Sequence, residues 1–349
     1  MPQITGPEPT TLPPTGYSTR NCTYISEACP VEFTIYGFYP NLGASWFFCI
    51  FFGIFFGLQF IQGLKWKNWT FMIALTWGCI AECVGYVGRI MLHHNPWSSN
   101  AFDIQIVCLI IAPAFIAAGI YLNLKHIVLE IGTSFSRLRP KYYTWIFILC
   151  DIFSLVLQGA GGGIAATADN GSTAQQTGNN LMLAGIVFQV FTLLVFAFFV
   201  IDYAIRAYQH RATLEPSAHK LMATTRWKLF IGSLTLAFIT VFMRCVFRIG
   251  EMAKGWGNPV MQDQTDFIVL DSVMITIAVF CLTVFHPGYT FPEMRQHGNN
   301  SPVGEFSRAD KEMTADIEST PPSLDGANGI KTGESKPKAG EGYFGSQGT

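Results

Sequence analysis

Residues 43–64 read GASWFFCIFFGIFFGLQFIQGL, a stretch without one charged side chain. A helix needs about 20 predominantly apolar residues to cross the hydrocarbon core of a bilayer, and this stretch meets that length. The residues before it lack the basic and apolar regions of a cleavable signal peptide. We therefore expect the stretch to be a transmembrane helix that itself directs membrane insertion.

Six further apolar stretches follow along the chain, at residues 69–92, 102–124, 143–166, 180–203, 228–250 and 266–286. The composition agrees, because only 13% of the residues are charged and a soluble domain usually carries about 25%. The pattern predicts an all-α polytopic membrane protein with seven transmembrane helices. The net charge of −1 gives no indication of a nucleic-acid partner.

Three regions follow from this pattern. Residues 1–42 form a polar N-terminal segment, and residues 43–288 form the seven-helix membrane domain. Residues 289–349 are rich in Gly, Pro, Ser, Lys and Glu, and they have too few apolar side chains to fold. We expect this last region to be a disordered tail.

Most of the 22 Lys and Arg residues fall in alternate loops and in the tail. Since basic residues are enriched in cytoplasmic loops, this places the N-terminus outside and the C-terminus in the cytoplasm. The glycosylation sequons at Asn21 and Asn170 then lie outside. Cys22 and Cys29 also lie outside, where they form either a local disulfide or two free thiols.

Charged side chains inside the spans are costly, and they tend to face the bundle interior and mark functional positions. In the second and in the sixth span they recur at a spacing that places them on one helical face. The residues concerned are Glu82, Tyr86 and Arg89 in the second span, and Arg244, Arg248 and Glu251 in the sixth.

Glu82 and Arg244 lie at similar depth, about 20–25 Å from the inner surface at 1.5 Å per residue. Asp271 in the seventh span returns to the same level. We hypothesise a buried network of Glu82, Arg244 and Asp271, with an Arg89–Glu251 pair above it. Such pairs either lock the helices in register or line a polar cavity, and both functions are compatible.

The fourth span carries Asp151 near the middle of the bilayer, then Gln158 and a glycine-rich run at residues 159–163. Small residues let a neighbouring helix approach closely. A buried carboxyl at this depth is also suited to exchange protons. No phosphate-binding motif, nucleophile motif or metal-ligand cluster accompanies these residues, so we expect no cofactor, no metal and no enzymatic activity.

Six motifs occur in order along the spans: ECVGY at residues 82–86 with Arg89, APAFIAA at 112–118 with Tyr121, DIFSLVLQGAGGG at 151–163, RCVFR at 244–248 with Glu251, Asp271, and HPG at 286–288. Together these motifs resemble the fungal lipid-translocating exporter family over roughly residues 35–290. The resemblance implies a seven-span fungal protein that moves or senses amphipathic molecules such as sphingoid bases, sterol derivatives or porphyrins.

Two functions remain open on these grounds. The first is a transporter that exports amphipathic lipids or toxic amphiphiles and so confers resistance, with Glu82, Asp151 and Asp271 suited to a cationic head group. The second is a seven-span lipid sensor that binds its ligand without moving it. Membrane lipids and an amphipathic small molecule are the expected partners. The plasma membrane is the expected location, with a vacuolar membrane as the alternative.

Overall fold

The computed structural model describes residues 22–26, 29–132, 140–168, 172–210, 216–253 and 259–290. Within these ranges, seven helices are long and apolar enough to cross a membrane, which confirms the predicted fold class of an integral membrane protein. The two sequon residues, Asn21 and Asn170, lie outside the described residues. So do residues 291–349, which make up nearly all of the predicted tail.

The helices follow the chain as α1 (Leu42–Trp66), α2 (Trp69–His94), α3 (Ser99–Ile131), α4 (Pro140–Thr167), α5 (Thr173–Gln209), α6 (Pro216–Ala223) and α7 (Thr225–Met252). The seventh span is built from α8 (Gln264–Asp266), a π-helix η5 (Phe267–Val273) and α9 (Met274–Val284). The short helix α10 (Pro287–Thr290) follows it, and a single 3-10 turn η2 (Val31–Phe33) precedes α1.

Most predicted spans differ from the observed helices by a few residues, but α5 begins seven residues before the expected position 180. Its first turns are polar, so hydropathy alone does not reveal them. The Ser172 side chain caps the helix by accepting a hydrogen bond from the Gln175 backbone N–H at 3.2 Å. Gly178 then packs directly on α4, so contact between the two helices, rather than contact with lipid, stabilises this polar segment.

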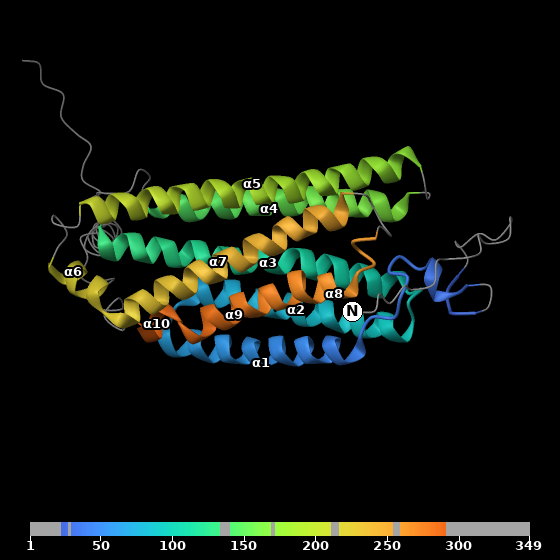
Figure 1. Cartoon of the computed structure of the whole chain (residues 1–349), viewed down its shortest axis with the longest axis horizontal. Coiled ribbons are helices and arrows are strands. Elements are labelled where there is room, and N and C mark those ends of the chain that lie inside the picture. Colours follow the sequence, from blue (N-terminus) through green and yellow to red (C-terminus); the bar gives the residue numbers. More distant parts are fainter. Residues whose placement is uncertain are drawn as a thin grey trace, which may run out of the picture. The chain divides into compact units, whose positions relative to one another are not determined.

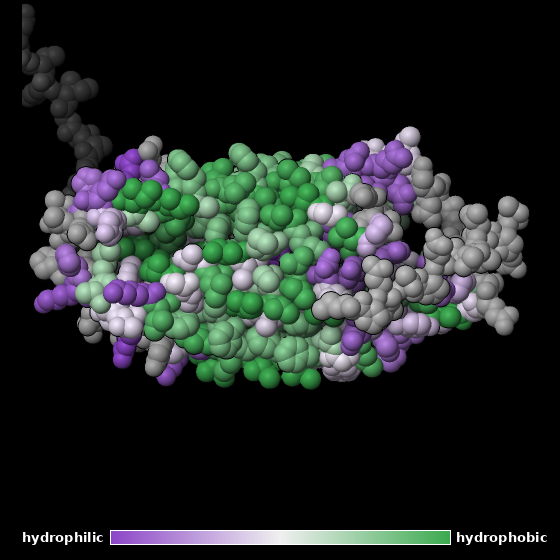
Figure 2. Space-filling model, viewed as in Figure 1, coloured by the Kyte–Doolittle hydropathy of each residue, from purple (hydrophilic) through white to green (hydrophobic). Residues whose placement is uncertain are grey.

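In Figure 1, α1 runs along one edge of the bundle beside α2, and the α4–α5 pair forms the opposite edge. Helices α3 and α7 lie between these edges, and α9 packs against α7. Figure 2 shows hydrophobic residues covering the middle of the visible face, with hydrophilic residues gathered toward both ends. This banding is the pattern expected of a bundle surrounded by lipid.

Glycines hold α4 and α5 at very short range. A Cβ atom added at Gly161 would lie 2.6 Å from the carbonyl oxygen of Gly178, and one at Gly185 would lie 2.8 Å from that of Ser154. In contrast, a Cβ atom added at Gly159 or Gly163 would meet nothing within 4 Å. The glycine-rich run therefore has one face that requires glycine for helix packing and another that does not.

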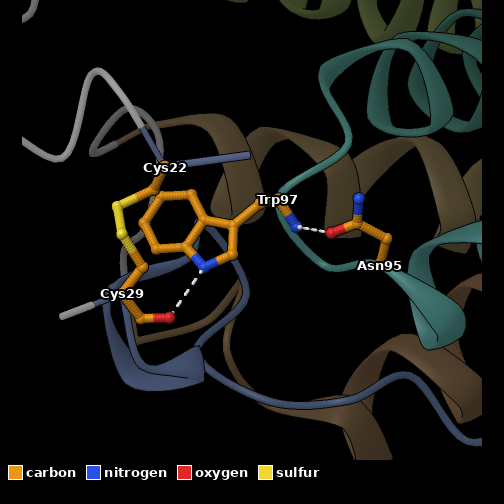
Figure 3. The surroundings of a disulfide bond; sticks show 4 residues. All are labelled: Cys22, Cys29, Asn95 and Trp97. Atoms are coloured by element: carbon orange, nitrogen blue, oxygen red, sulfur yellow. Dashed lines mark hydrogen bonds between the residues drawn. A yellow bond between two sulfur atoms is a disulfide. The ribbon is translucent and has the colours of Figure 1, made fainter. Parts of the chain in front are cut away.

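The segment before α1 is tied to the loop between α2 and α3. A disulfide joins Cys22 and Cys29, and the indole N–H of Trp97 donates a hydrogen bond to the Cys29 carbonyl at 3.1 Å (Figure 3). The Asn95 side-chain amide donates to the Thr23 carbonyl at 3.0 Å. We refer to the end of the bundle where these contacts lie as the disulfide end.

Candidate functional site

Arg244 lies at the centre of a buried ionic cluster that three helices build. Its Nη1 pairs with Oε1 of Glu82 on α2, and its Nε lies 3.0 Å from Oδ1 of Asp271 in η5. All three side chains have an exposed fraction of 0%. The three charges predicted to meet at one depth therefore do so.

The carbonyl of Leu109, which Pro113 leaves without its helical hydrogen bond, is a further partner of Arg244. Pro113 has no N–H, so it cannot make the helical hydrogen bond to the carbonyl of Leu109, four residues earlier on α3. Nη2 of Arg244 donates to that carbonyl at 2.8 Å instead. A backbone group that would be costly to leave unpaired at membrane depth thus becomes part of the site.

Arg248 continues the cluster one turn along α7. It contacts Glu251 at 2.7 Å and the same Oδ1 of Asp271 at 3.0 Å. In place of the predicted Arg89–Glu251 ion pair, the structure pairs Glu251 with Arg248 of its own helix at the i, i+3 spacing. Arg89 instead lies over the ring of Phe267, 4.0 Å from its centroid.

The arginines and the carboxylates of this cluster are equal in number, three of each when Arg89 is included. Such a balance is what burial requires, since an unpaired charge in a dry interior is strongly destabilising. Asp271 contacts both Arg244 and Arg248 from within the π-helix. Local π-helical turns are rare and are frequently found at functional sites.

A second group of polar side chains lies on the α4–α5 side. The Tyr121 hydroxyl donates to Oδ2 of Asp151 at 3.0 Å, and Asp151 forms no ion pair with any described residue. The Gln158 amide donates to Oε1 of Gln189 at 3.2 Å. All four side chains are buried within the helix bundle.

A cavity lies between these two groups. Its volume is about 20 Å³, and it is bounded by α3, α4, α5 and α7. Its polar lining comes from Arg244 and Arg248 on one side and from Gln158 and Gln189 on the other. The apolar lining consists of Leu109, Ile110, Pro113, Ile186 and Cys245. Guanidinium and amide groups thus face a small space inside the bundle.

The remaining sequence candidate, Tyr86, is buried against α1. Its ring stacks on Phe48 and Phe52 at centroid distances of 5.2 and 5.8 Å. It therefore fastens α1 to α2 next to the cluster, one turn from Glu82.

Sequence patterns missed several contributors. The carbonyl of Leu109 has a visible signal, since Pro113 follows it by four residues and must leave it free. Phe267 and Tyr36, which flank Arg89, have no signal beyond their aromatic character. Tyr121 stands out in the sequence only as part of a family motif, and its contact with Asp151 depends on the fold.

Comparison with known proteins adds independent evidence on the family of this chain. Residues 75–294 match the family described as RTA1 like protein. The chain is similar to the sphingoid long-chain base transporter RSB1 of Saccharomyces cerevisiae, with 33% identity over 290 residues that cover 73% of this chain and 74% of the relative. It is also similar to protoporphyrin uptake protein 1 of the same organism, with 32% identity, 59% of this chain and 65% of the relative. A third similar protein from this yeast is protein RTM1, with 31% identity, 62% of this chain and 68% of the relative. No solved structure matches the chain.

Proposed function

This chain belongs to the RTA1-like family, and from that premise we propose that it transports amphipathic lipids or other amphiphiles across a membrane. The observation that carries the proposal is the cavity between the ionic cluster and the two glutamines, which is mostly apolar but bordered by guanidinium and amide groups. Polar and ionisable groups inside a membrane bundle are expensive, and they tend to line the paths of substrates and ions.

The size of the cavity restricts what it can hold. Small-molecule sites usually occupy about 300–1,000 Å³, whereas the free volume here is about 20 Å³, close to that of one water molecule. A head group therefore enters only when the surrounding helices move apart, and there is no room for a long chain. The apolar part of the substrate would therefore lie between helices or in lipid. This division favours single-chain or flat amphiphiles, and sphingoid bases, sterol derivatives and porphyrin-like compounds are the proposed classes.

The cavity lining also indicates how a cationic head group would bind. Arg244 and Arg248 line the space, and their carboxylate partners are already engaged. Asp151 is the buried acid that pairs with no arginine or lysine among the described residues. It lies on α4, two turns before Gln158, which lines the cavity. We therefore propose Asp151, rather than Glu82 or Asp271, as the group that accepts an ammonium or a proton.

For the topology we keep the orientation given by the basic loops, with the N-terminus outside and the C-terminus in the cytoplasm. The disulfide end is then the outer end, where an oxidising environment preserves disulfides. Glycosylation at Asn21 and Asn170, the domain limits 43–288 with a cytoplasmic tail, and residence in the plasma membrane are parts of the same proposal. We assign no catalytic role to the chain.

The decisive experiment is flux in proteoliposomes that contain only this chain, with a fluorescent sphingoid base as the probe. We expect Asp151→Asn to reduce the initial rate by about tenfold, the loss typical of one charge-assisted contact. Asp103→Asn is the matched control, because it makes the same substitution at an exposed carboxylate on α3. Equal rates in the two variants would remove Asp151 from the site.

The same preparation separates transport from sensing. Saturable binding of the probe without flux above protein-free liposomes would identify a sensor and refute transport. A panel that includes a sterol derivative and a porphyrin then defines the accepted class.

A further inference from the structure

The segment from Cys29 to Asn41, which we call the strap, crosses the disulfide end of the bundle before α1 begins. Two of its side chains point inward and are nearly inaccessible, with exposed fractions of 6% for Thr34 and 5% for Tyr36. It turns at Gly37, which has a φ of +69° in the left-handed region that favours glycine. A polar terminal segment is thus folded onto the bundle instead of hanging free.

Tyr36 is the deepest part of the strap. The side-chain amide of Gln105 on α3 donates to its hydroxyl at 2.7 Å, and the guanidinium of Arg89 lies 5.6 Å from its ring centroid. Burial raises the pKa of Tyr36 to about 12, so the hydroxyl stays neutral at physiological pH. The ring therefore covers the buried ionic cluster at the disulfide end.

Beneath Tyr36, a group of large apolar side chains separates the strap from the cavity. It is composed of Leu92, Phe102, Ile106, Met182, Ile186, Met252 and Met261, all of them buried. Ile186 belongs to both regions, since it also lines the cavity. Three members are methionines, whose unbranched side chains adapt their shape readily. The barrier between the strap and the cavity is therefore narrow and deformable.

The strap is fastened at both of its ends and contacts α3 in its middle. At one end the Cys22–Cys29 disulfide is held against the α2–α3 loop by Trp97 (Figure 3). At the other end Nδ1 of His93 lies 2.7 Å from the Pro40 carbonyl, just before α1. Between them, Gln105 makes a side-chain hydrogen bond to Tyr36 at the point where the strap covers the cluster.

We propose that the strap is a disulfide-fastened lid, with Tyr36 as its plug, that controls exchange of head groups between the cavity and the disulfide end. This proposal deepens the transport function above and rests on it for the identity of the ligand. When Tyr36 and the methionines withdraw, the cavity and the ionic cluster open to that side. The disulfide and Trp97 return the strap to the closed position.

Hydrogen–deuterium exchange of the full chain in nanodiscs tests the lid directly, without any ligand. Cys22→Ser with Cys29→Ser, Trp97→Phe, and wild type treated with a reductant each remove one fastening. We expect amides of residues 34–41 to exchange about two- to tenfold faster in all three, the change that follows loss of one hydrogen bond holding a closed state. Trp145→Phe, at an exposed tryptophan on α4, is the matched control and leaves their exchange unchanged.

Binding kinetics of the fluorescent sphingoid base provide the second readout. A lid alters access in both directions, so loosening it raises the association and the dissociation rate by the same factor and leaves the Kd unchanged. Unchanged exchange of the strap after reduction and in the serine variant overturns the proposal, as does a faster exchange with unaltered binding rates. If no amphiphile binds even to wild type, the transport function fails and the exchange result alone decides whether the lid exists.

Discussion

An alanine at position 161 would place a methyl group inside the contact between α4 and α5. The added Cβ atom would lie 2.6 Å from the Gly178 carbonyl oxygen and 2.9 Å from the Cα atom of Met182. Both neighbours are backbone atoms, so no side chain can rotate away. The two helices would have to separate by roughly 0.8 Å to restore van der Waals contact.

The cost of that separation follows from the packing on either side. A gap of about 0.5–1 Å forfeits a quarter to a half of the dispersion energy of each atom pair along the contact, and overpacking typically costs about 1–3 kcal/mol. The gain in helix propensity from glycine to alanine offsets up to about 1 kcal/mol. Because both contacts are with backbone atoms, the upper part of the overpacking range applies, about 2–3 kcal/mol. After the propensity gain of about 1 kcal/mol is subtracted, we expect Gly161→Ala to lose about 1–2 kcal/mol of stability.

Gly163→Ala is the matched control, because its added methyl group meets nothing within 4 Å. It should be neutral or stabilise the protein by up to about 1 kcal/mol. The two variants then differ by about 1–3 kcal/mol, and at about 2–4 °C per kcal/mol their melting temperatures should differ by about 2–12 °C. Thermal unfolding in detergent, followed by tryptophan fluorescence, measures this difference. Melting temperatures within 2 °C of each other would refute the geometric argument.

Three further predictions concern the cluster, the cavity and a histidine that follows the last span. Arg244→Gln should destabilise the protein by about 3–5 kcal/mol, since it strands the buried carboxylate of Glu82 and leaves Asp271 with Arg248 alone. Glu82→Gln should cost about 1–2 kcal/mol, because the arginine keeps its other acid, Asp271. Equal losses of melting temperature would contradict this order. Gln158→Leu should weaken binding of the fluorescent probe about two- to tenfold, and adding Gln189→Leu should weaken it little more, because the two amides bond each other. Additive losses in a titration would show that they act separately. Burial lowers the pKa of His286 to about 4, below the ordinary value of about 6.5. The unfolded chain then takes up the proton first, so this contribution to stability is complete above about pH 6.5 and falls as the pH drops toward 4. Melting temperatures at pH 7.5 and 5 should show a smaller decrease in His286→Gln, and an identical decrease would exclude this residue.

The sequence predicts the features of this molecule that depend only on how deep a residue lies in the membrane. Hydropathy locates the seven spans, and counting residues from the basic loops brings Glu82 and Arg244 to the same level. The partner of Arg89 differs from the prediction, because depth does not say which direction around the helix a side chain faces. The early start of α5 also escapes prediction, since contact with α4 rather than lipid stabilises it.

Local geometry that departs from the α-helix limits such predictions further. Neither the π-helix around Asp271 nor the acceptance of an arginine hydrogen bond by the Leu109 carbonyl follows from apolar periodicity. Pro113 marks the second of these in advance, whereas residues 267–273 carry no comparable marker.

The π-helix changes which way the side chains of the seventh span face on either side of it. A π turn takes one residue more than an α turn, so it shifts the angular phase of everything that follows. The side chains before η5 and those of α9 after it therefore point in directions that one continuous α-helix would not give them. Phe267 and Asp271 lie in the π-helix where this direction changes. A single-residue deletion there would merge the two phases into one continuous α-helix. Either the acid or the whole of α9 would then face a different neighbour, so the length of this segment constrains the protein as strictly as its composition does.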